Sequence, residues 1–496
     1  MDIQKQLEEI LPADRIKTRL IDVLSFAADA GFYTLTPKAV VQPVNEQEII
    51  KLFHFSNAQF IPIVFRTGGT SLSGQSITDG ILVDLSQFWD RVKIENEGAL
   101  VRVQPGITGA MVNTYLKKYK RKIGPDPASI NSAMMGGILS NNSSGMCCGV
   151  VQNSYHTVKH IRFILPDGKS FNTEVEGDYI RFENECPDLY NLLISIRSRL
   201  ETDTVLHERI RQKYRIKNTV GYSVNAFIDF QHPLDILAHL LIGAEGTLAF
   251  IAETVMNTVP DYQFKSTAML YFPDIYTACQ ALVPLNNAGA RAVELMDRAS
   301  LYAIENMPNL PSVIKELPSG ASALLVEFQE TTYAELEEKV NMFLQDLTRL
   351  SLLHAPVFTS NPKEQEYFWK VRKGLFPSVG AVRKSGSTVI LEDVAFPVAR
   401  LGDAITDLQH LFKKYAYHNA IIFGHARDGN IHFLITPEFN SPEEVTRYDL
   451  FMGDVVNLVV NKYDGALKAE HGTGRNMAPF VETEWGGEIY ELMKQL

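Results

Sequence analysis

Two histidines near the C-terminal end of the chain have the spacing of a metal site. The stretch 420–435 places Asp428 and Gly429 between two apolar runs, and Asp-Gly is the strongest local signal for a two-residue hairpin turn. With that turn, His425 is predicted to face His432 on the next strand, with the two Cβ atoms about 5 Å apart. Two such imidazoles can bind one metal ion. The alternative is a buried core pair, but packed imidazoles need a metal or a carboxylate to complete their hydrogen bonding.

Glu470 and His471 offer a carboxylate and a third imidazole. On a regular strand their side chains would point to opposite faces. Gly472 and Gly474 follow them and let the backbone bend, so that both side chains can turn towards one site. Taken alone, Glu-His before glycines is a weak signal of function.

Arg372 is one of three basic residues in a short stretch. Together with Lys370 and Lys373 it lies in a predicted helix that ends near Gly374 and Pro377. Local sequence favours a solvated basic face for these three side chains. A guanidinium fork would also suit the carboxylate of a substrate, which it can bind with two hydrogen bonds.

Residues 62–86 predict an anion-binding loop between two strands. Apolar, β-branched runs at 61–65 and 81–85 flank a Gly/Ser/Thr-rich loop with no helical stretch. Positive φ is open to Gly68, Gly69 and Gly74, and hydroxyl donors come from Thr67, Thr70, Ser71 and Ser73. The spacing fits neither a P-loop nor a Rossmann fingerprint. An ordinary turn between strands remains the alternative.

Two further glycine-rich stretches accompany this loop. Residues 124–155 are too rich in Gly, Asn and Ser for a regular element and too long for a simple turn, and long loops inside a domain are usually functional. Residues 241–251 give another close glycine approach beside a strand. A large flat ligand would fit such surroundings.

Composition indicates an ordinary soluble enzyme. The 496 residues carry a net charge of −11, which disfavours nucleic acid and tight electrostatic attachment to anionic lipid. No apolar run is long enough to span a bilayer, and the first residues do not resemble a signal peptide. Four cysteines without C-x-x-C spacing exclude zinc fingers and iron–sulfur ligation, and the Cys147-Cys148 pair is expected to serve packing or loop chemistry.

Helical and strand patterns alternate along the chain. An amphipathic helix is predicted over 1–30, a strand over 37–43, and a helix opened by a capping box at 45–48 that runs to residue 55. From about residue 260 the glycine loops end. Strands at 266–272 and 322–328 and helices near 276–287 and 333–347 then predict a second α+β domain.

These three glycine-rich stretches together resemble the successive cofactor segments of the vanillyl-alcohol-oxidase type of FAD-binding domain. Within that type, the chain resembles the D-lactate, glycolate and D-2-hydroxyglutarate dehydrogenase branch, over residues 37 to the end. The resemblance implies an α+β protein with a two-part FAD-binding domain and an α+β cap, or substrate, domain. The implied division is an N-terminal helical segment (1–36), an FAD-binding domain (37–260), a cap domain (261–460) and a C-terminal segment returning to the FAD domain (461–496).

The resemblance also assigns roles to single residues. It implies FAD contacts at Arg66, Thr67, Gly68, Gly69, Thr70, Ser71, Gly74, Pro127, Ser129, Gly136, Gly137, Asn141, Gly145, Glu245, Gly246 and Ile251. His425, His432 and Glu470 would hold a divalent metal, with zinc the expected ion. His471 would be the catalytic base, and Arg372 would bind the substrate carboxylate.

Three positions depart from the hydroxyglutarate branch. Leu434, Phe376 and Leu391 stand where that branch has polar substrate contacts. On the predicted register Leu434 would lie on the metal face opposite Phe423. An apolar wall argues against a second substrate carboxylate and favours D-lactate, with D-2-hydroxyglutarate and glycolate as alternatives.

The resemblance leaves the partners of the chain open. The expected electron acceptor is an iron–sulfur domain, a quinone or a cytochrome, because the closest likeness is to members that continue into an iron–sulfur domain. The apolar positions of 484–496 have helical spacing and stop without a breaker, so this helix is predicted to be cut. A cytoplasmic location is expected, with peripheral association at the inner membrane face left open. A flavin-binding electron-transfer subunit without chemistry of its own, or an oxidase, are the competing classes.

Overall fold

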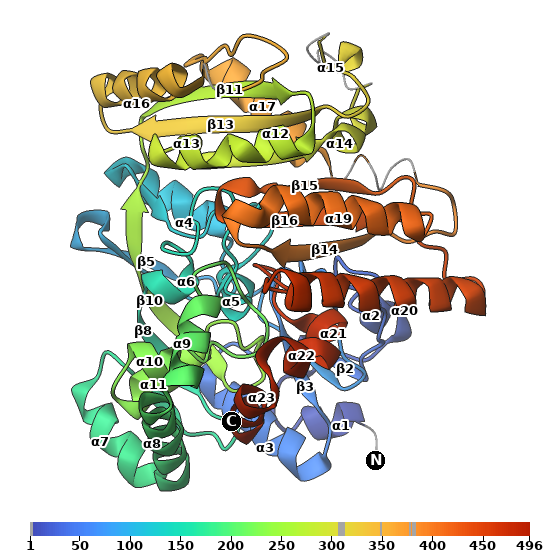
Figure 1. Cartoon of the computed structure of the whole chain (residues 1–496). Helices are drawn as coiled ribbons and strands as arrows, with labels where there is room; N and C mark the ends of the chain where they lie inside the picture. Colours follow the sequence, from blue (N-terminus) through green and yellow to red (C-terminus); the bar gives the residue numbers. More distant parts are fainter. Residues whose placement is uncertain (1–2, 306–312, 348–349, 376–377, 379–382) are drawn as a thin grey trace. The chain divides into compact units, whose positions relative to one another are not determined.

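The chain folds as two compact units. The computed structural model describes all residues except 1–2, 306–312, 348–349, 376–377 and 379–382. Unit 1 comprises Met1–Arg215, Thr219–Asp261 and Glu470–Leu496, and unit 2 comprises Ile216–Asn218 and Tyr262–Ala469. Both units combine helices with sheets (Figure 1), as expected for the α+β class. Among the described helices, none has the length and apolarity needed to cross a bilayer.

The first sheet of unit 1 holds the predicted strand–loop–strand. Its order is β1 (Ile16–Lys17), β2 (Ala39–Val41), β4 (Ile81–Asp84) and β3 (Ile63–Arg66). β4 pairs in parallel with both β2 and β3, whereas β1 pairs with β2 in antiparallel. Every residue of β4 is buried, which explains its continuous apolar run. The prediction of two strands joined without a helix is confirmed.

Helix α3 (Glu46–Gln59) follows β2 and begins at the predicted cap. The Asn45 side chain accepts a hydrogen bond from the Glu48 backbone N–H at 3.0 Å. The Glu48 carboxylate accepts from the Val44 N–H at 2.8 Å and pairs with Arg15 at 2.6 Å. The predicted helix is therefore confirmed, and it continues beyond residue 55 until Phe60 adopts the left-handed conformation.

The second sheet of unit 1 is antiparallel and centred on the long strand β10 (Phe250–Pro260). Its order is β5 (Val92–Glu95), β6 (Leu100–Val103), β10, β8 (Val158–Ile164) and β9 (Ser170–Asn172), and β7 (Arg121–Ile123) also pairs with β10. One buried cluster joins the two sheets, because Val41 and Ile81 of the first pack with Ile164 and Phe250 of the second. The strands that flank the glycine-rich loop are therefore packed into the core of unit 1.

Helices complete unit 1. They are α4 (Gly109–Leu116), α5 (Met135–Ser140), α6 (Ser154–Thr157), α7 (Glu176–Glu185), α8 (Pro187–Thr202), α9 (Thr204–Lys213), α10 (Ala226–Asp229), α11 (Pro233–Leu240), α21 (Gly474–Met477), α22 (Val481–Trp485) and α23 (Gly487–Gln495). The glycine-rich stretch 124–155 therefore contains two short helices that its composition did not predict. The predicted C-terminal helix is split, because Gly486 has a φ of 78° between α22 and α23.

The prediction of one amphipathic helix over residues 1–30 is wrong. The segment forms α1 (Ile3–Leu7), a 3₁₀ turn (Ala13–Arg15), β1 and α2 (Leu20–Leu24). Pro12 has no backbone N–H and cannot continue a helix from α1. After Pro12, residues Ile16–Lys17 form strand β1 paired with β2, although the apolar residues of this segment recur at helical spacing. The apolar side chains still enter the core, as Leu7 and Leu11 show.

Unit 2 is a six-stranded antiparallel sheet with helices on both faces. The order is β11 (Phe264–Phe272), β13 (Ser322–Glu330), β12 (Ala292–Asp297), β15 (Ile421–His425), β16 (Asn430–Ile435) and β14 (Ile390–Ala395). Its helices are α12 (Ile275–Gln280), α13 (Leu282–Asn287), α14 (Arg298–Ala303), α15 (Val313–Glu316), α16 (Tyr333–Asp346), α17 (Pro362–Lys373), α19 (Leu401–Lys414) and α20 (Pro442–Val456). The predicted strands and helices of this region are confirmed, with the first helix divided into α12 and α13.

Alternate residues of β16 face different layers. Phe433 packs against Phe412 of α19 and Phe451 of α20. Leu434 belongs to a cluster with Phe423 of β15 on the opposite face, which α14, α15 and α17 cover. His432 shares this second face, because side chains two apart in a strand point the same way.

Candidate functional site

The loop between β3 and β4 offers a row of backbone donors. Within the described part of the chain, the N–H groups from Thr67 to Leu72 donate to no backbone carbonyl. Gly69 and Gly74 have φ values of 63° and 74°, a conformation that suits glycine. Successive N–H groups in such a loop form a concave site for an anion.

A pocket in unit 1 lies against this loop. The sequence-predicted cofactor residues that line it are Thr67, Gly69, Thr70, Ser71, Gly136, Gly137, Asn141, Glu245, Gly246 and Ile251. The three glycine-rich stretches therefore meet at one place. A Cβ on Gly136 would lie 2.7 Å from Pro105, so only glycine permits the close approach of α5. A Cβ on Gly246 would meet nothing within 4 Å, which leaves open space for a ligand.

The remaining predicted cofactor residues lie outside the pocket lining. Arg66 donates to the carbonyls of Phe26 and Ala28 at 3.2 and 2.9 Å, and so fastens the N-terminal segment to the loop. Gly68 packs against the backbone of Ser132, and the Gly74 carbonyl accepts from Arg475 at 3.1 Å.

Pro127, Ser129 and Gly145 also stand apart from the lining. The carbonyls of Pro127 and Ser129 close turns by accepting from Ile130 and Ser132 at 2.9 and 2.8 Å. The Gly145 N–H donates to the Glu470 carboxylate at 2.8 Å. All three shape the segment between β7 and α6.

Several lining residues escaped sequence reasoning. They are Phe65, Gln75, Ser76, Leu85, Pro105, Ser140, Ala249 and Phe250. Gln75 is the most informative, because its amide donates to Glu245 at 3.1 Å and to the His471 carbonyl at 2.8 Å. Its place inside the glycine-rich loop was a usable signal, since it is the one long amide side chain there.

The turn at Glu470 and His471 is bent as the glycines predict. Gly472 and Gly474 have φ values of 77° and 55°. The His471 carbonyl accepts from Gln75 and, at 3.1 Å, from Asn141, so unit 1 holds the backbone of this residue. The Glu470 carboxylate is held through its Oε2 atom by the Ser144 hydroxyl at 2.5 Å as well as by Gly145.

In unit 2 the predicted hairpin exists, but its predicted register is wrong. Phe423, and not His425, lies opposite His432. A 3₁₀ turn at Ala426–Asp428 and a left-handed Gly429 lengthen the connection. The register of the two strands therefore differs from the predicted one by two residues. His425 and His432 become diagonal neighbours on one face, with their Nε2 atoms 3.2 Å apart.

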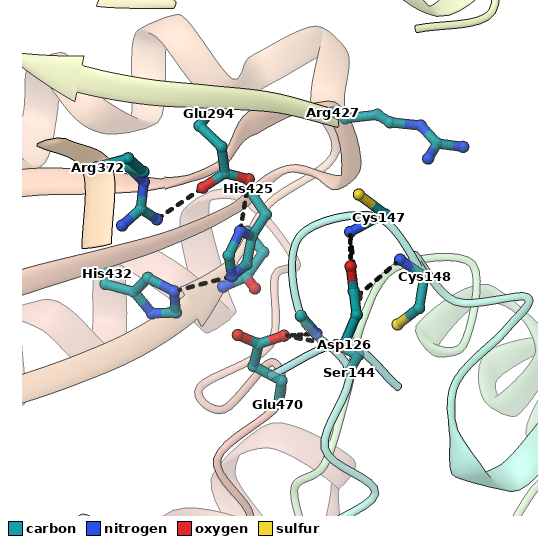
Figure 2. Close-up of polar contacts among 12 residues, drawn as sticks. Asp126, Ser144, Cys147, Cys148, Glu294, Arg372, His425, Arg427, His432 and Glu470 are labelled. Carbon is teal, nitrogen blue, oxygen red and sulfur yellow. Dashed lines mark hydrogen bonds and ion pairs between the residues drawn. The ribbon is translucent and has the colours of Figure 1, made fainter. Parts of the chain in front are cut away.

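Carboxylates hold the other side of both imidazoles. His425 Nδ1 lies 2.7 Å from Glu294 Oε1, and His432 Nδ1 lies 3.2 Å from Asp393 Oδ1 (Figure 2 shows Glu294). An ionised carboxylate only accepts, so His425 Nδ1 is the donor to Glu294 and its Nε2 presents a lone pair. This lone pair faces His432 Nε2 at 3.2 Å, where either the proton of His432 or a metal ion satisfies it, and imidazoles held by carboxylates are usual metal ligands.

A buried network supports Asp393. Its carboxylate accepts from the Asn430 side chain at 2.7 Å and from the Ala469 N–H at 3.0 Å. Lys217 donates to Asn430 at 3.3 Å. Glu392, the neighbour of Asp393, forms a fully buried ion pair with Lys468 at 2.7 Å. Sequence reasoning missed these residues, although charged side chains inside an apolar strand were a signal.

Arg372 is buried, so the solvated basic face favoured by local sequence is wrong at this position. Only 5% of the residue is exposed. Its guanidinium pairs with Glu294 Oε2 at 2.7 Å and lies 4.6 Å from the centre of the Phe423 ring. Burial alone would raise the pKa of Glu294, but the charges of His425 and Arg372 lower it. One carboxylate therefore links the arginine to the histidine pair (Figure 2).

The expected apolar wall is partly observed. Leu434 is buried beside Phe423, although it pairs with Ile421 and not with Phe423. Leu391 packs against the same cluster. Phe376 lies outside the described residues.

Two family models match successive parts of the chain. Residues 37–174 match the FAD binding domain, and residues 262–496 match the C-terminal domain of FAD linked oxidases. The first contains the anion-binding loop, and the second contains Arg372, both histidines and Glu470.

Curated proteins are similar to the chain along most of its length. Glycolate oxidase subunit GlcD of Bacillus subtilis is 23% identical, over 100% of this chain and 93% of that protein. D-2-hydroxyglutarate dehydrogenase of Pseudomonas putida is 26% identical over 95% of this chain, which spans only 48% of the relative. The mitochondrial D-lactate dehydrogenase [cytochrome] of Arabidopsis thaliana is 25% identical over 93% of this chain and 70% of its own length.

Among solved structures, p-cresol methylhydroxylase with substrate bound matches with a TM-score of 0.68 at 13% identity, covering 99% of this chain and 92% of that one. This likeness concerns the fold. The chain therefore combines an FAD binding domain with the C-terminal domain of FAD linked oxidases, and it has the FAD-binding fold of the vanillyl-alcohol-oxidase and p-cresol-methylhydroxylase type.

Proposed function

We propose that the chain oxidises a D-2-hydroxy acid, with D-lactate as the favoured substrate and pyruvate as its product. The observation that carries this proposal is the pair of buried imidazoles whose Nε2 atoms face each other at 3.2 Å. Glu294 accepts from His425 Nδ1 and Asp393 lies 3.2 Å from His432 Nδ1, and carboxylates beside the Nδ1 atoms are typical of metal-binding histidines. A subunit that only bound flavin would have no use for it.

FAD is the ligand that we propose for the pocket of unit 1. The N–H groups from Thr67 to Leu72, which donate to no backbone carbonyl among the described residues, would hold the pyrophosphate, and Gly246 would leave room for the rest of the ligand. When bound, the flavin supplies the acceptor for the hydride that leaves the α-carbon. We assign the other FAD contacts predicted from the sequence, of which Arg66 is the first and Ile251 the last along the chain, to the same cofactor.

His425, His432 and Glu470 are proposed as ligands of one divalent metal ion, zinc being the expected one. Glu470 directly follows Ala469, whose N–H donates to the Asp393 carboxylate beside His432. A metal ion held by these residues would lower the pKa of the substrate hydroxyl. Imidazole nitrogens with a carboxylate are a common donor set for zinc.

Arg372 and His471 complete the proposed site. The Arg372 Nε is buried and makes no hydrogen bond within the described residues, so the guanidinium keeps a donor for the substrate carboxylate while Glu294 holds its other edge. His471 would take the hydroxyl proton as general base. Its backbone is fixed by Gln75 and Asn141.

Leu434 and Leu391 support the choice of D-lactate. Both pack in the hydrophobic cluster that contains Phe423, and among its described members no basic side chain would pair with a second carboxylate. D-2-hydroxyglutarate and glycolate are the alternatives that the relatives' names suggest. The acceptor of the electrons is proposed to be an iron–sulfur domain, quinone or cytochrome, since the chain spans about half the length of its D-2-hydroxyglutarate dehydrogenase relatives.

An anaerobic titration tests the proposal. The FAD-loaded chain is mixed with D-lactate, L-lactate, D-2-hydroxyglutarate or glycolate, and bleaching of the flavin absorbance is followed with and without a chelator. Fast bleaching by D-lactate that the chelator abolishes is expected. Preference for D-2-hydroxyglutarate would overturn the substrate assignment, and no bleaching by any of the four acids would favour a non-catalytic electron-transfer subunit.

A further inference from the structure

The adjacent thiols of Cys147 and Cys148 have no role in the reaction proposed above. Neither is in a disulfide, and Cys147 is partly exposed whereas Cys148 is buried. The backbone N–H groups of both residues donate to the Asp126 carboxylate, at 3.0 Å from Cys147 and 3.2 Å from Cys148 (Figure 2). The Cys148 thiol donates to the Gly149 carbonyl at 3.3 Å, and the two sulfurs point away from one another in Figure 2. A small reagent can therefore reach Cys147 first, and the neighbouring thiol joins the reaction after its side chain rotates.

Asp126 connects the thiols to Glu470. Its side chain holds the two cysteine N–H groups, and its backbone N–H donates to the Ser144 carbonyl at 2.8 Å. Ser144 and Gly145 in turn hold the Glu470 carboxylate at 2.5 and 2.8 Å. All of these residues belong to unit 1. A movement of the cysteine backbone is thus passed through Asp126 to this carboxylate.

We propose that Cys147 and Cys148 form a modification site for oxidants and for reagents that bridge two thiols, and that modification displaces Glu470. With hydrogen peroxide, two thiols give one disulfide and two waters, the sulfurs losing the electron pair that peroxide gains. With phenylarsine oxide, two thiols form two As–S bonds and release one water. Neither reaction depends on the proposed function, whereas an effect on turnover does.

Closing a ring between neighbouring residues must move the backbone. Consecutive Cα atoms are about 3.8 Å apart, which is shorter than the separation of about 4.4–6.8 Å usual for disulfide-bonded residues. Because the peptide fixes this distance, the ring closes only after the backbone and side-chain torsions of both cysteines change, and we expect the Cys148 N–H to lose its bond to Asp126. Gly145 and Gly149, with φ values of 125° and 55°, flank the pair and can absorb the change.

Mass spectrometry of the full chain tests the thiol chemistry. After peroxide treatment and alkylation, the peptide with Cys147 and Cys148 is expected to be lighter by two hydrogen atoms and unalkylated, and dithiothreitol should reverse this. Phenylarsine oxide should be captured stoichiometrically. C147S and C148S should each abolish both results, whereas C186S and C279S, which change isolated buried cysteines, should not. Separate alkylation of both thiols after peroxide, or no loss of capture in C147S, would overturn the proposal.

Metal binding tests the link to Glu470. Loss of an outer partner of a metal ligand typically costs about 10- to 100-fold in metal affinity, so zinc affinity of the full chain should fall by that factor on treatment with phenylarsine oxide and recover with a dithiol. An unchanged affinity in a chain that carries the arsenical would refute the coupling. A chain that captures the arsenical but never binds zinc would count against the proposed metal site, while leaving the thiol site in place.

Discussion

At the scale of single residues, Glu294 organises the chemistry of unit 2. It is fully buried, and its two oxygens contact different groups, His425 through Oε1 and Arg372 through Oε2. One side chain therefore sets both the tautomer of an imidazole and the direction of a guanidinium. No sequence motif indicated it, because Glu294 lies 131 residues before His425 in a strand that is otherwise apolar up to Asp297.

Replacing Glu294 by Gln should weaken metal binding. The amide keeps the shape but presents no ionised acceptor to the His425 Nδ1–H, so a loss of about 10- to 100-fold in zinc affinity is expected. Competition with a chelating dye measures it. Glu327→Gln is the matched control, since Glu327 is also buried in this sheet but contacts Thr267 and Trp369. Equal affinities of the two variants would contradict the role assigned to Glu294.

At the scale of elements, the β3–β4 loop depends on a close backbone contact. A Cβ on Gly68 would lie 2.4 Å from the Ser132 carbonyl oxygen, which is too close, so the loop would have to move and its N–H row would lose its shape. A Cβ on Gly177 in α7 would meet nothing within 4 Å.

Gly68→Ala is accordingly expected to bind FAD at least about tenfold more weakly, which corresponds to the loss of about one hydrogen bond to a charged group. Gly177→Ala should instead stabilise the chain by about 0.5–1 kcal/mol, because alanine is the better helix former. Fluorescence titration with FAD and urea unfolding separate the two effects. Unchanged FAD affinity in Gly68→Ala would show that the loop does not hold the cofactor.

The start of α14 gives a pH-dependent prediction. Asp297 caps this helix by accepting from the Ser300 N–H at 2.7 Å, and burial raises its pKa to about 6. Because the folded pKa exceeds the unfolded value, the protonated side chain favours folding, and this contribution is lost as the pH rises through about 6.

Asp297→Asn keeps a capping oxygen without the charge. Relative to the wild type, its stability should therefore increase between pH 4 and pH 8, by up to about 3 kcal/mol at about 1.4 kcal/mol per pKa unit. Urea unfolding of both proteins at the two pH values measures this. A difference that does not change with pH would show that Asp297 is not buried as a neutral acid.

The sequence predicted elements better than it predicted how they meet. Local patterns were sufficient for β4, whose burial on both sides gives an unbroken apolar run, and for α3, whose cap is a neighbour in the chain. They failed for β1, whose strand conformation depends on pairing with β2, which is distant in sequence. They also failed for the turn that ends at Gly429, because hairpin turns of several lengths are compatible with the same residues. The register error moved His425 by two residues, yet both histidines stayed on one face because strand periodicity is two.

At the scale of the whole molecule, binding of FAD should stabilise unit 1 more than unit 2. The proposed FAD pocket is lined only by residues of unit 1. At a concentration one hundred times its Kd, a ligand stabilises the state that binds it by about 2.7 kcal/mol.

Hydrogen exchange should reveal this difference. Peptides covering Thr67 to Leu72, whose N–H groups donate to no backbone carbonyl among the described residues, are expected to exchange quickly in the free chain and slowly with FAD. Peptides from β11 and β13 of unit 2 should change little. Equal protection of both regions, or none in the loop, would contradict the assignment of the pocket.

The order in which the units appear along the chain bears on synthesis at the ribosome. Unit 1 is interrupted by unit 2, and its segment Glu470–Leu496 is synthesised only after the whole of unit 2. In the folded chain Lys213 is 1% exposed and pairs with Glu484 of that segment at 3.0 Å, and a buried ion pair that lacks one partner is costly. The nascent N-terminal portion should therefore remain immature and depend on chaperones until Glu484 has been synthesised.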